Sequence, residues 1–565
     1  MPVLETMKLG VEGLKESLRG KRTRSRPPRD RETVRKRDEW IAAGLAVGVA
    51  VVYCAVVAHS LTWAYVDLGD GNYLYTSARM ADGLRIYRDF LSPQPPLHLV
   101  TGSLLIRLGR LWQNPLMTVR VFSMMLHALT MGWIYLLGRR LTQTPYGGTA
   151  AALIYTIIPV GFWWTLEYQS EPLEVFWLLG SLWFFLPLRP RGMLAAGALM
   201  SLAALTNMTA APYALGCLVY LAVRHPRRLF LRFAVPFAAV LACVIAYYQI
   251  RTGAYLENVI LNQVGSYPKE GFWRYAGGKL LSEGSNILHW EGGYVLLALL
   301  GLILYNRTDT RPEREFLVWY ALIFVLSIVF VTKGGTMDYI FTIGEPMVAL
   351  FGAYFVCQFF YPATHRRFFR EPFWRDTSFA PQIVFFALVA LSVGLAGARF
   401  VRMTLAEEQF EHGEDRFRRV EHFIDRYSKP GDRILAHPFY AFATGRLLAE
   451  EYSELFLWKM KYMLERQENR PGDGVRKVQR IEQQLLEGKI PIVIAADSRS
   501  YSPLTEKASL SQPGPLILFS PEIRSAIEKK YKALDHRDAS FQTKSFNMRI
   551  FVPKSDEELA QGGTR

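Results

Sequence analysis

The chain has 565 residues, of which 50% are hydrophobic, 13% aromatic and only 21% charged. Apolar runs at 41–61, 147–166 and 379–398 are each long enough to cross the hydrocarbon core of a bilayer, which takes roughly 20 helical residues. The composition therefore excludes a string of soluble domains and predicts a polytopic membrane protein. The net charge of +16 requires no nucleic acid as partner, because much of it stands where orientation rules place basic residues.

Ten candidate membrane segments follow one another along the chain. They are 41–63, 117–138, 147–166, 172–188, 193–223, 233–250, 292–305, 316–332, 339–361 and 379–398. Clusters of arginine lie between them, at 139–140, 189–191, 224–228, 307–314 and 366–375, and the positive-inside rule places these clusters in the cytoplasm. If the run 193–223 crossed the membrane once, every later arginine cluster would lie outside. The clusters all stay in the cytoplasm only if this run forms two short helices that meet near the polar break at Asn207. We therefore predict about eleven spans, with the N-terminus inside and the C-terminus outside the cell's inner (plasma) membrane.

This topology divides the chain into four parts. Residues 1–39 form a basic cytoplasmic tail that precedes a retained signal-anchor helix, because the first apolar run is too long for a cleavable signal. Residues 40–401 form the transmembrane domain, with external loops at 64–116 and 251–288. Residues 402–555 form an extracytoplasmic domain, and 556–565 a disordered tail. All four cysteines lie in apolar runs, so neither disulfides nor a cysteine-based metal site is expected.

The part from 402 to 555 has the pattern of a small α/β domain. Helical patterns at 407–427, 475–487 and 521–532 alternate with apolar strands at 433–436, 490–496 and 548–552. Such alternation favours a partly parallel sheet.

Acidic side chains gather on the external face. They are Asp67, Asp70, Asp89, Glu167, Glu171 and Asp338. The stretch from Asp67 to Leu97 is the richest in polar residues: its pattern predicts a helix after Asp70 that ends at Gly83, and an amphipathic helix at about 97–112 that begins at the prolines Pro95 and Pro96.

The motifs of this stretch resemble a known family. Asp70-Gly-Asn-Tyr-Leu-Tyr, Ala81-Asp-Gly, Tyr87-Arg-Asp-Phe and Pro95-Pro96-Leu are similar to the first external loop of the GT-C glycosyltransferases, in particular the branch of protein O-mannosyltransferases and lipid A aminoarabinose transferases. The resemblance covers the membrane half of the chain. It implies a multi-span enzyme that takes a sugar from a polyprenyl-phosphate donor outside the cytoplasm.

The resemblance also implies roles for individual residues. The family usually has an adjacent Asp-Glu pair in this loop, where this chain has Gly69-Asp70, so Asp70 corresponds to the catalytic carboxylate and Asp67 is left as a substitute for the missing partner. Relatives have acids in the turn that here carries Glu167 and Glu171, although Glu171 also stands where an acid caps a helix. Asn207 takes the place of a lysine found in many relatives.

Cations and aromatics near these acids complete the candidate site. Lys333, Arg85, Arg88 and Lys269 are candidates for holding the donor phosphate, although Lys333 also fits a lysine that snorkels at a helix end. Candidates for substrate contacts are Tyr73, Tyr75, Asp89, Glu171, Asp338 and Tyr339, with Trp163 and Trp164 as further stacking partners. Glu345, an acid at membrane depth, is either functional or paired within the protein, and His98 is expected to pack rather than to bind a metal.

Together these features predict an inverting glycosyltransferase with Asp70 as general base. The expected partners are the bilayer, a lipid-linked sugar donor and a carbohydrate, lipid or protein acceptor of the cell envelope. No cofactor is required, and a divalent metal ion is left open. The alternatives are a transporter or flippase of a lipid-linked or anionic substrate, and a structural subunit of an envelope-assembly complex. Transport is disfavoured because the acids lie at the outer face rather than the midplane and no inverted repeat is evident.

Overall fold

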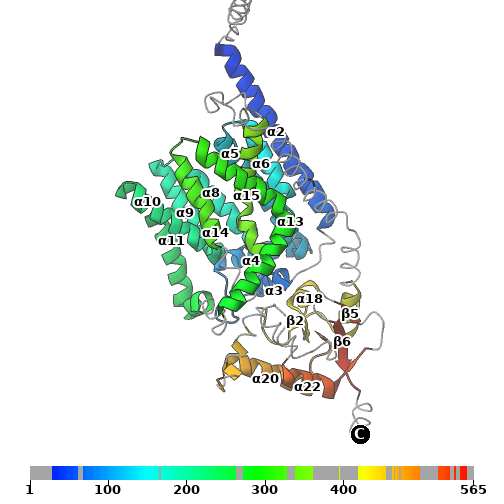
Figure 1. The fold of residues 1–565 in the computed structure, drawn as a ribbon. Helices are drawn as coiled ribbons and strands as arrows, with labels where there is room; N and C mark the ends of the chain where they lie inside the picture. Colours follow the sequence, from blue (N-terminus) through cyan, green and yellow to red (C-terminus); the bar gives the residue numbers. More distant parts are fainter. Residues whose placement is uncertain are drawn as a thin grey trace, which may run out of the picture.

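The computed structural model describes residues 28–61, 68–164, 167–261, 272–327, 338–360, 418–453, 472–496, 520–534, 540–542 and 547–555, together with residue 394 and a few positions between 458 and 469. These residues form a large helical bundle with a smaller α/β domain at one end (Figure 1). The chain is therefore a multi-pass membrane protein with an extramembrane C-terminal domain.

The bundle is built from helices that begin at prolines or charged residues, except for α10 and α13. They are α2 (Pro28–Ser60), α5 (Pro115–Thr142), α6 (Pro145–Ile157), α7 (Pro159–Trp164), α8 (Glu171–Phe185), α9 (Pro190–Thr206), α10 (Ala211–Arg224), α11 (Arg227–Thr252), α13 (Phe272–Thr308), α14 (Glu313–Ser327) and α15 (Glu345–Phe360). Within the described residues, four helical segments are long and apolar enough to span a membrane by themselves: Lys36–Ala58, Pro115–Thr142, Arg227–Thr252 and Trp273–Thr308. Proline suits the first turn of a helix because the N–H that it lacks has no partner there.

The ambiguous run 193–223 is two helices, as predicted. Helix α9 ends at Thr206, the short 3₁₀ turn η1 (Met208–Ala210) follows, and α10 continues. Asn207 makes this break, because its backbone is extended and its side chain accepts a hydrogen bond from the N–H of Thr209. The two-helix prediction is thus confirmed, while the span at 379–398 lies outside the described residues apart from residue 394.

Three other boundaries differ from the sequence prediction. The segment 147–166 is not one helix, because α6 stops at the extended Ile158 and Pro159 begins α7. The segment 339–361 begins as a 3₁₀ helix, η4 (Asp338–Ile343), and becomes α-helical only at Glu345. The predicted loop 251–288 is largely helical: the π-helical turn η2 (Glu257–Leu261) follows α11, and α13 begins at Phe272 and runs for 37 residues.

The first external loop contains both predicted helices. They are α3 (Leu68–Ala81) and α4 (Pro96–Leu111). The turn after α3 requires glycine, because Gly83 has a φ of +98°. Both helices lie between the bundle and the C-terminal domain (Figure 1).

The C-terminal domain combines a helix at 418–427 with α18 (Pro438–Ala443), α20 (Asp473–Leu486) and α22 (Pro521–Lys530). Its main sheet is antiparallel: β6 (Asn547–Pro553) pairs with β3 (Val493–Ala496), β4 (Tyr531–Ala533) and β5 (Ser540–Gln542). Parallel pairing occurs between β1 (Arg433–Ile434) and β2 (Leu447–Leu448), and at a bridge from Leu435 to Val493. The α/β prediction is confirmed, and the parallel part is small.

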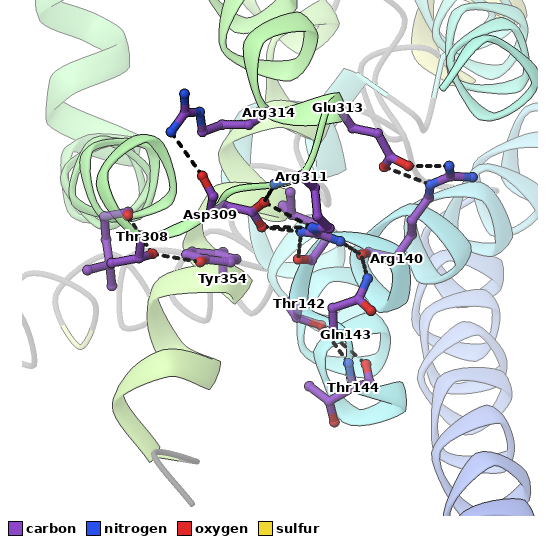
Figure 2. Close-up of polar contacts among 12 residues, drawn as sticks. Arg140, Thr142, Gln143, Thr144, Thr308, Asp309, Arg311, Glu313, Arg314 and Tyr354 are labelled. Atoms are coloured by element: carbon purple, nitrogen blue, oxygen red, sulfur yellow. Dashed lines mark hydrogen bonds and ion pairs between the residues drawn. The ribbon is translucent and has the colours of Figure 1, made fainter. Parts of the chain in front are cut away.

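Ion pairs and hydrogen bonds join segments of the bundle around the C-terminal end of α5 (Figure 2). Arg140 binds the carboxylate of Glu313 through two hydrogen bonds, of 2.5 and 2.9 Å. Arg311 pairs with Asp309 and donates to the carbonyl oxygens of Arg140 and Leu141, at 2.6 Å each, so that it caps the last turn of α5. This end contains two of the arginine clusters that the sequence assigns to the cytoplasm.

Candidate active site at the junction of the domains

Helix α3 is fastened to the C-terminal domain by Tyr75. This side chain is only 2% exposed and packs in the apolar core of that domain. Its hydroxyl accepts a hydrogen bond of 2.9 Å from the N–H of Leu448, and burial, together with the negative charge of Glu451, raises its pKa. The structure therefore places Tyr75 in domain docking, where it has no free ring face for a sugar.

Two polar contacts extend this docking along the same helix. The hydroxyl of Thr76 donates to that of Ser453 at 2.8 Å, and both side chains are buried. One turn later, Arg79 binds Glu451 at 3.1 Å, with the two side chains 15% and 16% exposed. Helix α3 is thus held by polar contacts on successive turns.

The first turn of α3 also touches the C-terminal domain. A Cβ added to Gly71 would lie 2.6 Å from Cε1 of His437 and 2.8 Å from Cβ of Phe439, so glycine permits this close approach. Asp70 directly precedes Gly71 within this turn. The side chain of Asp70 and all of Asp67 lie outside what the structure describes.

Three aromatic rings in contact with one another connect α3 to the membrane bundle. His98 of α4 packs edge-on against Tyr73 at a ring distance of 5.0 Å and stacks on Tyr168 at 4.0 Å. The Tyr168 hydroxyl donates to the carbonyl oxygen of His98 at 2.6 Å, and Gln94 donates to the Tyr73 hydroxyl at 3.2 Å. Burial lowers the pKa of His98 to about 3, which keeps it neutral. His98 is therefore a packing residue, as predicted.

Buried acids follow Tyr168 at the start of α8. Glu167, Glu171 and Glu174 are 3%, 2% and 0% exposed, respectively. Gln169 donates to Glu167 at 2.9 Å. Asn207, from the break between α9 and α10, donates to Glu171 at 2.9 Å. The second oxygen of Glu171 has no hydrogen-bond partner among the described residues.

Glu174 belongs to the same group and was not selected from the sequence. Both of its oxygens lie within hydrogen-bond distance of the Thr209 hydroxyl, at 2.7 and 2.8 Å. The signal was present, because an acid one turn inside an apolar run is costly and marks a function or a specific partner. The pairing with Thr209 depends on the fold and has no sequence signature.

Glu345 belongs to a separate pair of buried acids around α7. It is 2% exposed, and its carboxylate lies against Gly161, where any added Cβ would overlap it. Glu291 is equally buried and accepts a hydrogen bond of 3.0 Å from the N–H of Val160. The two acids thus flank the first turn of α7, where a negative charge is favoured. Glu345 is therefore buried inside the protein beside α7.

The loop between α3 and α4 presents two of the predicted cations. Arg85 and Arg88 are exposed, and Asp89 accepts a hydrogen bond of 2.7 Å from the N–H of Arg85. Arg88 also lies 3.9 Å from Asp89, with the two side chains 57% and 38% exposed. Asp89 therefore shapes the loop, and the guanidinium groups remain accessible to an anionic ligand.

The other predicted site residues are less completely described. Lys333 and Lys269 lie outside the described residues. Asp338 and Tyr339 open η4, which packs against α7 and α8 and so lies beside the buried acids. Among the described residues there is no group of three or more His, Cys, Asp or Glu side chains that could hold a metal ion.

Comparisons with known proteins concern the fold and one part of the chain. A family model described as dolichyl-phosphate-mannose-protein mannosyltransferase matches residues 94–249. The crystal structure of ArnT from Cupriavidus metallidurans bound to undecaprenyl phosphate is similar with a TM-score of 0.55 at 13% identity, over 91% of this chain and 98% of that chain. An oligosaccharyltransferase from Archaeoglobus fulgidus tethered with an acceptor peptide gives a TM-score of 0.48 at 12% identity, over 91% and 74%. A search of curated proteins found no match.

Proposed function

We propose that this chain, which has the fold of the GT-C membrane glycosyltransferases, transfers a sugar from a polyprenyl-phosphate donor to an acceptor of the cell envelope. The observation that carries the proposal is the packing of α3, with Asp70 in its first turn, between the C-terminal domain and the rings that lead to the Glu167 turn. This packing joins two segments that carry predicted acids, the first turn of α3 and the Glu167 turn, beside the C-terminal domain.

In the proposed reaction, Asp70 is the general base. Its carboxylate accepts the proton of an acceptor hydroxyl while that oxygen attacks the anomeric carbon of the donor. The new bond joins the acceptor oxygen to the sugar, the bond between the anomeric carbon and the phosphate oxygen breaks, and the configuration inverts. A phosphate leaves without a general acid because its pKa is already low and nearby cations stabilise its charge. Asp67 is the alternative base, and Glu167 supports the site from the second acidic turn.

The donor phosphate would bind the accessible guanidinium groups of Arg85 and Arg88, with Lys333 and Lys269 as further cations. Arginine suits this task because its planar fork matches phosphate oxygens. Glu171, whose second oxygen lacks a partner among the described residues, would accept a hydrogen bond from a sugar hydroxyl. Tyr73, Asp89, Asp338 and Tyr339 complete the proposed surroundings of the substrate. We assign this site to the external side of the membrane.

The test is a transfer assay with purified protein, labelled polyprenyl-phosphate sugars and envelope extracts as acceptors. Asp70→Asn should lower the rate by roughly 10²-fold or more, since it removes the base. Asp82→Asn is the matched control, because Asp82 lies just after the same helix but pairs with Arg79 and Arg110 at the surface. Full activity in Asp70→Asn would refute the assignment of the base. Movement of the lipid-linked sugar across the bilayer without any covalent product would instead support a transporter.

A further inference from the structure

We propose that Tyr87 is a positioning residue for the donor phosphate, because it fixes the turn that presents Arg85 and Arg88. The inference rests on the proposed role of these two arginines in binding the phosphate of the lipid-linked donor. It adds that their arrangement is set from outside their own loop, by aromatic rings at the end of α11 and in the segment that follows it.

The two arginines stand at the surface of one tight turn. The N–H groups of Arg88 and Asp89 both donate to the carbonyl oxygen of Arg85, at 3.3 and 2.9 Å. The carboxylate of Asp89 accepts in return from the N–H of Arg85 at 2.7 Å. Arg85 and Arg88 are exposed, whereas Ile86 and Tyr87 between them are each 3% exposed. The turn therefore buries its middle and leaves two cationic side chains open to an anion.

Tyr87 takes a backbone conformation that a tyrosine rarely adopts. Its φ is +69°, in the left-handed region, where the Cβ crowds the backbone. A residue stays there only when its surroundings hold it, and such residues gather at functional sites. If the hold were released, Tyr87 would return to a negative φ and the chain would change direction after it. Arg88 would then move relative to Arg85.

Two other tyrosines hold the ring of Tyr87. It packs edge-on against Tyr248 of α11 at a ring distance of 5.6 Å, and against Tyr255, which follows α11, at 5.1 Å. The Tyr87 hydroxyl donates to the carbonyl oxygen of Gln94 at 2.7 Å, which ties the turn to the residues just before α4. Edge-to-face ring pairs are favourable by amounts of the same order as the cost of a left-handed tyrosine. Loss of one ring should therefore shift the turn toward release.

A hydrogen bond joins the same two segments a few residues further on. Asn258 of η2 is 2% exposed and accepts from the N–H of Ser92 at 3.2 Å. Its amide group also donates to the carbonyl oxygen of Ala254 at 2.9 Å, so its own turn fixes its orientation. The loop between α3 and α4 is thus docked on residues 254–258. A phosphate site on this loop is preorganised, since binding does not have to order the arginines first.

Substitutions at Tyr255 test the positioning without touching the loop that carries the arginines. In the sugar-transfer assay, Tyr255→Leu should raise the KM for a labelled polyprenyl-phosphate sugar by roughly threefold to tenfold with kcat within about twofold, because a smaller fraction of the protein has the turn formed. Tyr255→Phe keeps the ring and should restore the original KM. Tyr247→Leu is the matched control, since Tyr247 is 54% exposed and its ring contacts Tyr248 and Arg251.

A second variant acts at the other end of the same residue. Tyr87→Phe keeps the ring and loses only the hydrogen bond to Gln94. It should raise the KM by roughly threefold or more with little change in thermal unfolding, because one neutral hydrogen bond is lost. This variant keeps the test decisive if Tyr255→Leu fails to fold.

A double-mutant cycle shows whether the ring acts through the arginines. Binding is measured directly, by titrating the purified protein in nanodiscs with polyprenyl phosphate, and phosphatidylglycerol serves as a competitor. Arg88→Gln should weaken binding by roughly tenfold, because a charged hydrogen bond to the phosphate is lost. Adding Tyr255→Leu to Arg88→Gln should cost less than it does in the original protein, because residues that act through one another are not additive.

The outcomes separate this inference from the proposed function. Unchanged KM and binding in Tyr255→Leu and Tyr87→Phe, while Arg88→Gln binds weakly, would overturn the inference and leave the proposed function intact. Losses of kcat that follow thermal stability, without a change in KM, would also overturn it, because they indicate packing only. Unchanged binding in both Arg85→Gln and Arg88→Gln would overturn the proposed phosphate contacts and this inference with them. Equal displacement by phosphatidylglycerol would assign the arginines to bulk lipid, with the same result.

Discussion

The ion pair between Arg79 and Glu451 offers a direct test of how the two domains are joined. The charged atoms lie 3.1 Å apart and both side chains are about five-sixths buried. With an effective dielectric constant of about 20, their attraction is about 5 kcal/mol before desolvation is subtracted. Desolvation removes much of this, so we expect a coupling free energy of about 1–2 kcal/mol. Each single alanine substitution should cost about 2–3 kcal/mol, because it leaves the other charge partly buried without its partner.

A double-mutant cycle measures this coupling. The variants Arg79→Ala, Glu451→Ala and the double variant are compared with the original protein by denaturant unfolding in detergent, and by the rate of proteolysis of the C-terminal domain. Asp82→Asn is the control, since its side chain is 35% exposed and it also pairs with Arg110, so it should cost less than about 1 kcal/mol. Additive single-variant effects, with a coupling near zero, would refute the conclusion that this pair holds the domains together.

Three further predictions concern stability and are measured by thermal unfolding. Burial lowers the folded-state pKa of His98 to about 3, so between pH 6.5 and 3 the unfolded chain binds more protons than the folded one, and the free energy of unfolding should fall as the pH falls. His98→Phe should reduce the slope of the unfolding free energy against pH by up to about 1.4 kcal/mol per pH unit. An unchanged slope would contradict a neutral His98. Gly161→Ala should destabilise the protein by about 1–3 kcal/mol, because the added methyl group overlaps the buried carboxylate of Glu345. The control Gly132→Ala, whose added Cβ meets no atom within 4 Å, should be neutral or stabilise the protein by up to about 1 kcal/mol. Equal effects of the two variants would contradict the packing around α7. Thr209→Val should lower the free energy of unfolding by about 1–3 kcal/mol, because it removes the hydroxyl that donates to the buried Glu174. The control Thr130→Val, which loses only a hydrogen bond to a carbonyl of its own helix, should cost less. The reverse order would contradict the pairing of Thr209 with Glu174.

The membrane helices could be predicted from the sequence because hydropathy and arginine clusters report directly on the bilayer. The same signals located the break at Asn207, where a polar residue interrupts an apolar run. They missed the break at Ile158, because the run stays apolar through Pro159 and only the missing N–H ends the helix. They also placed the start of α13 too late, since the helix extends beyond its most apolar part.

The candidate site could be predicted only in part. Their charge at the end of a predicted span and the family resemblance brought Glu167 and Glu171 to attention, and the packing of Tyr168 on His98 shows that their turn contacts the first external loop. The sequence assigned Tyr75 to the substrate because aromatics serve both sugars and cores, and only the fold shows that it is buried in the C-terminal domain. The close approach of His437 to Gly71 had no sequence signal, since the two residues belong to different domains.

The arginine pairs around the C-terminal end of α5 have a consequence for biogenesis. Arg140 and its partner Glu313 are separated by 173 positions in the sequence, and Glu313 opens a helix made much later. During synthesis, the guanidinium of Arg140 therefore remains without this partner while the earlier helices enter the bilayer. On the predicted topology, its positive charge would act on helix orientation in that interval and would be paired only when α14 is in place. On that topology, the same residue would first be an orientation signal for the nascent chain and afterwards a clamp between finished helices.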